Sequence, residues 1–170
     1  EVCGDAMLTL GDGNVESLLT ITNTANCRSL VGVWDGENGS AKLILKDGAV
    51  LQVGENTTIT DGIVNTWKAD FEMNGGEIIG TPNSGDKAVG VLIKESEDTF
   101  TMTGGTIKNC SASGVCVNKG TFTMNGGEIT ECSKTSGYVC ANTNNRAKFI
   151  YKGGTVGDTV AMIENTLYQS

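Results

Sequence analysis

The sequence predicts an all-β protein that folds as a right-handed parallel β-helix, a disulfide-stapled solenoid of about six coils. Two observations lead to this prediction: a short motif that recurs along the chain, and a composition that disfavours helices. The 170 residues include 24 glycines and only 1 proline, with abundant threonine, asparagine and valine. Glycine and threonine disfavour helix interiors, whereas short runs of alternating apolar and polar residues are typical of strands.

The recurring motif reads Phe-x-Met-x-Gly-Gly-x-Ile in its clearest copies, which begin at Phe71, Phe100 and Phe122. More degenerate copies begin at Leu8, Leu43 and Phe149, so successive copies start 22 to 35 residues apart. Such periods indicate a solenoid, a propeller or an array, and a propeller blade requires about 40 residues or more. A coil of a parallel β-helix fits the observed period, because insertions of unequal length are accommodated in loops.

The alternation within each copy assigns side chains to the interior of the solenoid. Phe100 and Met102 point inward, the threonines beside them point outward, and the Gly-Gly pair bends the chain where a Cβ atom would obstruct the turn. One residue from each coil then builds each core stack. The predicted stacks are Phe71, Phe100, Phe122 and Phe149; Met73, Met102 and Met124; and Ile78, Ile107 and Ile129.

Three segments follow one another within this single domain of residues 1–170. Residues 1–40 depart from the motif and are expected to form an N-terminal cap or irregular coils. Residues 41–157 form the regular coils, and a second short strand precedes each late motif copy, at Gly90–Ile93, Gly114–Val117 and Gly137–Cys140. Residues 158–170 depart from the motif again and are expected to form a C-terminal cap or a linking segment.

The six cysteines indicate an oxidising compartment, and therefore a secreted or cell-surface protein. Adjacent coils stack about 4.8 Å apart and disulfides need Cα atoms about 4.4–6.8 Å apart, so cysteines at equivalent places in neighbouring coils can bond. A ladder of reduced, buried thiols is the alternative. The predicted disulfides are Cys110–Cys132 and Cys116–Cys140, which leaves Cys3–Cys27 for the N-terminal segment.

Charge and hydropathy exclude several classes of partner. The net charge of −8 argues against nucleic acid and against anionic membrane surfaces. The sequence has no apolar run of 18 residues, so no membrane insertion is expected. The open ends of a β-helix carry unpaired strand edges, which predict self-association end to end. A glycan or another cell-surface molecule is the further partner that we expect.

Catalysis is not predicted, and no catalytic, cofactor-binding or metal-binding residue is assigned. The chain has no histidine, so Ser-His and Cys-His nucleophile pairs cannot form. Glu77 and Glu128 occupy the same motif position two coils apart, or about 9.6 Å. That separation is close to the about 6.5–9.5 Å of inverting glycosidases, but solvated turn residues are the favoured interpretation.

Two sets of side chains carry a functional alternative to their structural interpretation. Trp34 and Trp67 can stack on sugars, although a place in the core or in a cap is favoured for isolated tryptophans. Outward-facing threonines resemble the ladders of ice-binding solenoids, but the β-propensity of threonine on a wet strand face is the favoured explanation, because charged residues in the neighbouring coils limit the ladder to two coils. These threonines are Thr99, Thr101, Thr103, Thr121 and Thr123.

The Phe-x-Met-x-Gly-Gly-x-Ile motif resembles the repeat of bacterial and archaeal adhesin-like cell-surface proteins with the pectate-lyase-like right-handed β-helix fold. The stretch from Leu43 to Asp61 is similar to their early coils, and the resemblance covers residues 41–157. It implies a β-helix and an extracellular structural or adhesive role. The polysaccharide lyases of this fold use aspartate clusters for Ca²⁺ with a nearby basic residue, and the sequence reproduces no such constellation.

Several functional hypotheses follow. The first is an extracellular structural or adhesive protein whose subunits stack end to end into a surface filament. The second is a monomeric carbohydrate-binding or adhesion module of a larger surface protein. A polysaccharide-degrading enzyme and an ice-binding protein are the less favoured hypotheses.

Overall fold

Strands are the only regular elements in the part of the chain described by this computed structural model, residues 1–35, 40–81, 88–133, 138–142, 146–157 and 168–169. They form three sheets. Sheet A contains β1 (Val2–Cys3), β4 (Val31–Trp34), β7 (Gly62–Trp67), β10 (Val89–Ile93), β13 (Val115–Val117) and β16 (Val139–Ala141). Sheet B contains β2 (Met7–Leu10), β5 (Lys42–Leu45), β8 (Asp70–Met73), β11 (Thr99–Met102), β14 (Thr121–Met124), β17 (Lys148–Tyr151) and β19 (Tyr168–Gln169). Sheet C contains β3 (Leu19–Thr22), β6 (Ala49–Gln52), β9 (Glu77–Ile79), β12 (Thr106–Lys108), β15 (Glu128–Thr130) and β18 (Thr155–Val156).

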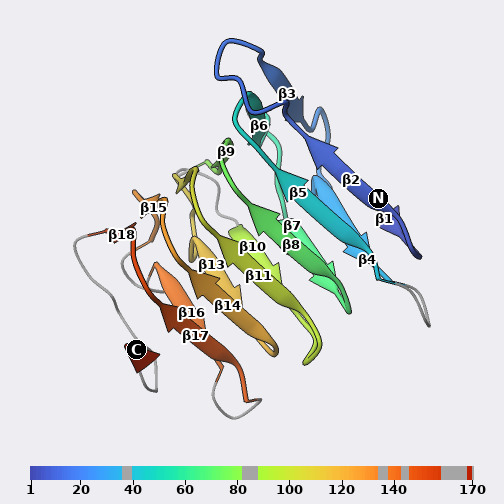
Figure 1. The fold of residues 1–170 in the computed structure, drawn as a ribbon. Helices are drawn as coiled ribbons and strands as arrows, with labels where there is room; N and C mark the ends of the chain where they lie inside the picture. Colours follow the sequence, from blue (N-terminus) through green and yellow to red (C-terminus); the bar gives the residue numbers. More distant parts are fainter. Residues whose placement is uncertain (36–39, 82–87, 134–137, 143–145, 158–167, 170) are drawn as a thin grey trace.

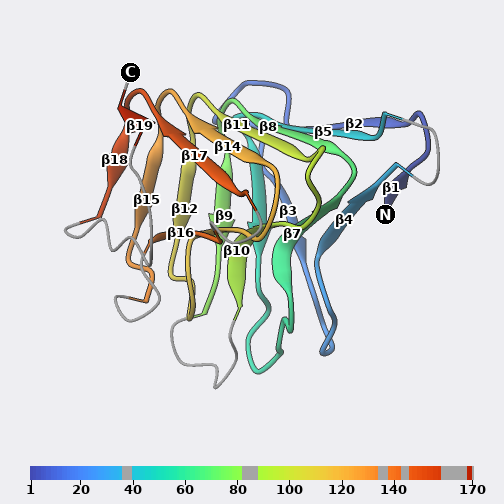
Figure 2. The ribbon, with the colours of Figure 1, turned by 90° about the horizontal axis from the view of Figure 1, so that it is seen from below.

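The chain visits the sheets in the order A, B, C, and β1 to β18 repeat this order six times. Each strand pairs in parallel with the equivalent strand of the next repeat. We call each A-B-C triplet a rung. The six rungs make about five full turns, because no described strand of sheet A follows β18 to close the sixth turn. Figures 1 and 2 show the rungs stacked from the N-terminal to the C-terminal end around a common interior. The prediction of an all-β parallel β-helix is confirmed.

The two terminal segments differ in how they join this stack. Residues 1–40 contain β1 to β4, which pair in register with the strands of the following rungs. The chain therefore enters the solenoid order at once, without a separate capping element in the described residues. Of residues 158–170, only β19 is described, and it pairs with β17. The remainder of the predicted C-terminal cap lies outside the described residues.

The interior is built from columns of like side chains, one from each rung. Phe71, Phe100 and Phe122 are fully buried, and Phe149 is buried at the last rung. The successive ring centroids lie 4.6, 4.7 and 5.0 Å apart and the planes are within 10° of parallel. The spacing equals the separation of neighbouring strands, so the rungs themselves set the stacking distance. The Met73–Met102–Met124 and Ile78–Ile107–Ile129 columns are fully buried in the same register.

The Gly-Gly pairs make the corner between sheets B and C. Gly105 has φ +82°, a conformation that residues with a Cβ rarely adopt. A Cβ atom at Gly105 would lie 2.6 Å from Met73 Cε and 2.7 Å from two carbonyl oxygens of the preceding rung. The second glycine of the motif is therefore required both by the backbone conformation and by the close stacking of rungs.

Candidate functional site

The outer face of sheet A carries the two tryptophans of the chain. Trp34 at the end of β4 pairs in register with Trp67 at the end of β7, and Gly32 pairs with Asn65 two positions earlier. Because side chains alternate along a strand, these four positions face outward, while Val33 and Thr66 between them face the core. Trp34 is 46% exposed and Trp67 is 49% exposed. The interpretation of these residues as core or cap residues is therefore wrong.

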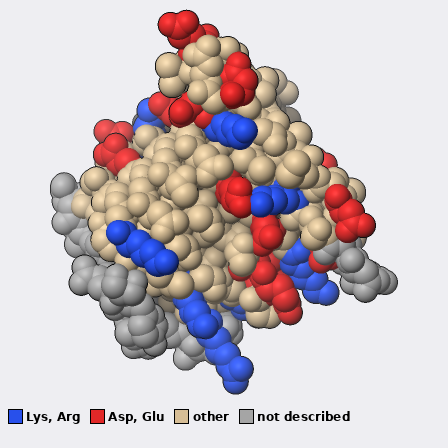
Figure 3. Space-filling view, in the orientation of Figure 1, with Lys and Arg blue, Asp and Glu red and all other residues tan. Residues whose placement is uncertain are grey.

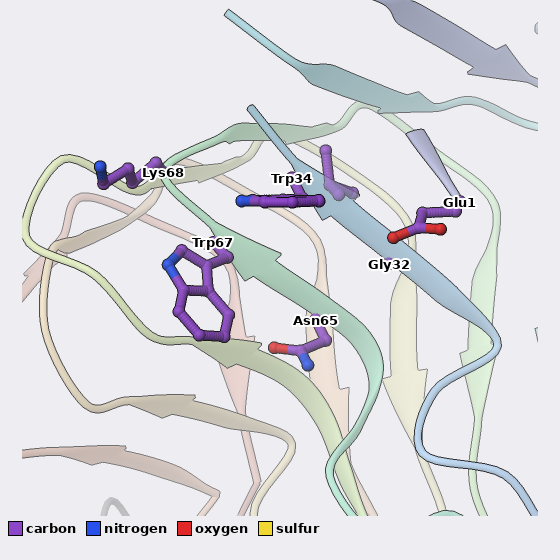
Figure 4. Close-up of a pocket in the computed structure, with 7 residues that line it drawn as sticks. Glu1, Gly32, Trp34, Asn65, Trp67 and Lys68 are labelled. Carbon is purple, nitrogen blue, oxygen red and sulfur yellow. The ribbon is translucent and has the colours of Figure 1, made fainter. Parts of the chain in front are cut away.

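The tryptophans form two walls of a surface groove with a volume of about 440 Å³. Figure 4 shows the Trp34 indole edge-on and the Trp67 indole nearly face-on, so the two rings are inclined to each other. Gly32 forms part of the floor, and a Cβ atom there would meet nothing within 4 Å. The groove is lined by Glu1, Gly32, Val33, Trp34, Asn65, Trp67 and Lys68.

A second, more polar hollow of about 310 Å³ continues this groove along the same face. Gly32, Asn65 and Trp67 line both hollows, so the two form one surface groove with an aromatic end and a polar end. The polar end adds Arg28, Ser29, Leu30 and Lys94. A ligand that filled both ends would need an apolar face and hydrogen-bonding groups along its edge.

Two oxygen atoms on the groove wall lack hydrogen-bond partners within the described part of the chain, Asn65 Oδ1 and Ser29 Oγ. Asn65 directs its carbonyl oxygen toward Trp67 (Figure 4). Both atoms are buried from solvent, and a buried polar group without a partner costs about 1–3 kcal/mol. The polar groups that the groove presents to a ligand are therefore the charged side chains at its polar end, Arg28 and Lys94.

Asp61 organises the cations at the polar end. Its Oδ2 accepts hydrogen bonds from Arg28 Nη2 and from Lys94 Nζ, each at 2.9 Å. Partial burial raises the pKa of Asp61, but the bonds and charges of Lys94 and Arg28 outweigh burial and leave the pKa below its ordinary value. Lys94 Nζ also lies 6.0 Å from the centroid of the Trp67 ring. The ion pairs thus hold a cation beside the indole before any ligand arrives.

Asp98 positions the strand end that carries Trp67. This fully buried carboxylate accepts bonds from Thr66 Oγ1 at 2.8 Å and from the backbone N–H of Ala69 at 2.9 Å, the residues on either side of Trp67-Lys68. It also accepts the backbone N–H groups of Lys94 and Glu95, each at 3.0 Å. One carboxylate therefore fixes the backbone at both Trp67 and Lys94, although it does not line the groove.

The cysteines are free thiols in the structure, and their positions differ. Cys116 and Cys140 pair in register in sheet A with 3.1 Å between their sulfur atoms. The bond from Cys116 lowers the pKa of Cys140 to about 7 despite partial burial, and the pKa of Cys116 is raised. Cys110 and Cys132 are buried after the equivalent strands β12 and β15. Disulfide formation in both pairs stays a prediction.

The register gives no support to the third predicted pair. Cys3 lies opposite Trp34 in sheet A. Cys27 instead lies opposite Ile59, with which its backbone forms an isolated parallel β-bridge. Cys27 therefore stands seven residues before the position in its rung that faces Cys3. The Cys3–Cys27 disulfide stays a prediction that the strand pairing does not favour.

The carboxylates and threonines weighed above occupy ordinary surface positions. Glu77 and Glu128 both pair with Thr106, and Glu77 forms an ion pair with Lys108 at 2.9 Å. The threonine columns continue into Asp70 and Glu72 on one side and into Lys148 on the other. Neither set lines the groove on sheet A.

The spacing of residues around the two tryptophans, which is not part of the repeat motif, indicates the groove in the sequence. Val31-Gly-Val-Trp34 and Val64-Asn-Thr-Trp67 share their spacing, so both tryptophans take the same outward position two residues after a small or polar one. No such pattern indicates that Arg28, Ser29 and Lys94 line the groove, because these residues lie outside the strands.

Comparison with protein-family models, with curated proteins and with solved structures finds no match in any of the three. None of the described segments is a helix capable of crossing a membrane. Within the described residues, no cluster of three or more carboxylate, thiol or imidazole side chains is arranged to hold a metal ion.

Proposed function

We propose that this chain is an extracellular adhesive β-helix module that binds carbohydrate in the groove of Trp34 and Trp67. The observation that carries the proposal is the register of two half-exposed indoles in a groove that Arg28 and Lys94 also line. Exposed large aromatic side chains grouped in a hollow indicate a binding surface, since soluble proteins rarely leave them uncovered together. The resemblance of the repeat motif to adhesin-like surface proteins supports the same role.

Sugar rings match the chemistry of the groove. The C–H face of a sugar ring is apolar and packs on an indole, and its equatorial hydroxyls project from the rim. In this groove, a ring that rests on Trp67 has the side chains of Arg28 and Lys94 at its edge as hydrogen-bond donors. The inclined indole of Trp34 closes the aromatic end. An aliphatic or fully aromatic ligand would form no hydrogen bonds with these side chains.

Tryptophan fluorescence tests the proposal directly, because both tryptophans of the chain line the groove. A panel of neutral and acidic oligosaccharides is titrated into the protein and into Trp67→Ala. We expect a saturable fluorescence change with at least one glycan, and a loss of about tenfold or more in affinity in the variant. Isothermal titration calorimetry confirms the affinity of the variant, which retains only one tryptophan.

Glu55→Ala is the control, because it truncates an exposed side chain in the connection between β6 and β7, away from the groove. It should bind like the parent chain. Binding that survives Trp67→Ala unchanged, or a panel in which no glycan binds, would refute the groove as a carbohydrate site.

A structural role through end-to-end association is the second candidate, and the first rung favours it. Apart from the two tryptophans, the exposed large hydrophobic side chains of the described residues all lie in this rung. They are Met7, Leu8, Val15, Leu18 and Leu19. Leu8 stands in the column of Leu43, which is fully buried, so the first rung is an uncovered cross-section of the core. Sedimentation velocity at increasing concentration should show assemblies; a monomer throughout would reject this role.

A further inference from the structure

The first and the last rung of the solenoid carry opposite charge, although residues 158–170, which follow the last rung, add Asp158 and Glu164. Residues 1–22, which contain the first rung, include four acidic residues and no lysine or arginine: Glu1, Asp5, Asp12 and Glu16. Residues 138–157, which contain the last rung, include three basic residues and no aspartate or glutamate: Arg146, Lys148 and Lys152. Acidic atoms stand at the top of Figure 3, toward the N-terminal end, and basic atoms at its lower left, toward the last rung.

The charges also occupy equivalent corners of the solenoid. Asp5 lies in the connection from β1 to β2, and Arg146 lies in the corresponding connection from β16 to β17, both from sheet A to sheet B. Asp12 and Glu16 lie between β2 and β3, and Lys152 lies between β17 and β18, both from sheet B to sheet C. A copy stacked as a continuation of the solenoid would therefore place an acidic corner on a basic corner twice.

Both ends also have strand edges that no described strand covers. The sheets begin with β1, β2 and β3 and finish with β16, β19 and β18, each paired on one side only. Backbone N–H and C=O groups at such edges pair readily with another strand. The exposed Leu8 and Leu19 of the first rung lie at the same end and lose water contact when a further rung covers them.

We propose that the acidic, apolar first rung of one chain stacks on the C-terminal end of a second copy of this chain, where β16, β19 and β18 form the edges beside the basic last rung. This inference rests on the proposed end-to-end association and specifies which ends meet. Contact between two first rungs would bring acidic corners together, and like charges across an interface oppose association. A head-to-tail contact does not close on itself, so repeated stacking yields an open filament.

Two charge-reversal variants test which ends meet. One variant carries Asp5→Lys and Glu16→Lys in the first rung, and the other carries Arg146→Glu and Lys152→Glu in the last rung. All four side chains are exposed, and Glu55→Lys, an exposed charge reversal between β6 and β7, is the control. Sedimentation velocity and negative-stain microscopy follow association of each variant alone and of an equimolar mixture, after thermal unfolding has shown that each variant is folded.

Each end variant alone should associate at least about tenfold more weakly than the parent chain, and the mixture should regain association because opposite charges face each other again. The control should associate like the parent. If the first-rung variant associates more strongly with the parent chain than the parent does with itself, the contact joins two first rungs and head-to-tail stacking is wrong. If the parent associates and charge reversal changes nothing, the pairing of ends is wrong although self-association stands. A parent chain that stays monomeric overturns both.

Discussion

Cys116 Sγ lies 3.1 Å from Cys140 Sγ, across two strands of sheet A that pair in register. A disulfide needs about 2.05 Å between sulfur atoms and Cα atoms within about 4.4–6.8 Å, which neighbouring strands supply. Mild oxidation should therefore link these residues without rearranging the rungs. Non-reducing peptide mapping should recover a Cys116–Cys140 peptide pair and a Cys110–Cys132 pair. A Cys110–Cys116 link would contradict the stacking of the two pairs.

The same thiols should differ in reactivity when the protein is reduced. The hydrogen bond from Cys116 lowers the pKa of Cys140 to about 7, so a large fraction of Cys140 is thiolate at neutral pH. The hydrogen bond with Cys132 and, after it, burial raise the pKa of Cys110, which is almost inaccessible. Iodoacetamide followed by mass spectrometry should label Cys140 first, with a rate that rises through a midpoint about pH 7. A midpoint near that of an ordinary thiol would show that Cys116 does not activate Cys140.

The phenylalanine column should dominate the stability of the regular rungs. Phe122 is fully buried between Phe100 and Phe149, with centroid distances of 4.7 and 5.0 Å. Phe122→Ala should lower the free energy of unfolding by about 3–5 kcal/mol, because it removes buried area and leaves a cavity in a stack that cannot collapse along its axis. Urea denaturation measures the change. Thr123→Ala, the outward neighbour, is the control and should cost less than about 1 kcal/mol.

The regular rungs were predictable because their information is local. The motif places Phe100 and Met102 inward by alternation, and it places Gly105 at a corner that only glycine fits. These rules hold within eight residues and need no knowledge of the rest of the chain. Residues 1–40 follow the same solenoid order, but their first corner reads Gly11-Asp-Gly13 and lacks the Gly-Gly pair, so the expectation was a cap or irregular coils.

The groove could not be predicted in the same way, because the residues that form it do not recur at the spacing of the repeat motif. Trp34 and Trp67 are 33 residues apart, whereas the motif copies in the same two rungs, at Leu43 and Phe71, are 28 residues apart. Because the connections differ in length, the tryptophans and the motif copies of the same two rungs do not share one fixed sequence period. Only the pairing of β4 with β7 shows that the indoles share a face.

Asp98 should couple the stability of the solenoid to the order of the groove. Its carboxylate accepts four hydrogen bonds, from Thr66 Oγ1 and from three backbone N–H groups. Asp98→Ala removes all four bonds and leaves the buried N–H of Ala69 without a partner, and Thr66 Oγ1 keeps only a 3.5 Å contact with Leu92 O. Each buried donor without a partner costs about 1–3 kcal/mol, so with the lost bonds to Lys94 and Glu95 we expect a loss of about 3 kcal/mol. The loss is measured by urea denaturation, with the exposed neighbour Glu97→Ala as the control.

Fluorescence separates the positioning role of Asp98 from its contribution to stability. Thr66 and Ala69, which the carboxylate holds, flank Trp67, so Asp98→Ala should free the indole to move on the strand end. At a temperature where the variant is still fully folded, acrylamide should quench its tryptophan emission more strongly than that of Glu97→Ala. Equal quenching in a destabilised Asp98→Ala would mean that the carboxylate stabilises the rung without positioning Trp67. Because both tryptophans contribute to the emission, the comparison is repeated with Trp34→Phe in each background, where Trp67 is the single reporter.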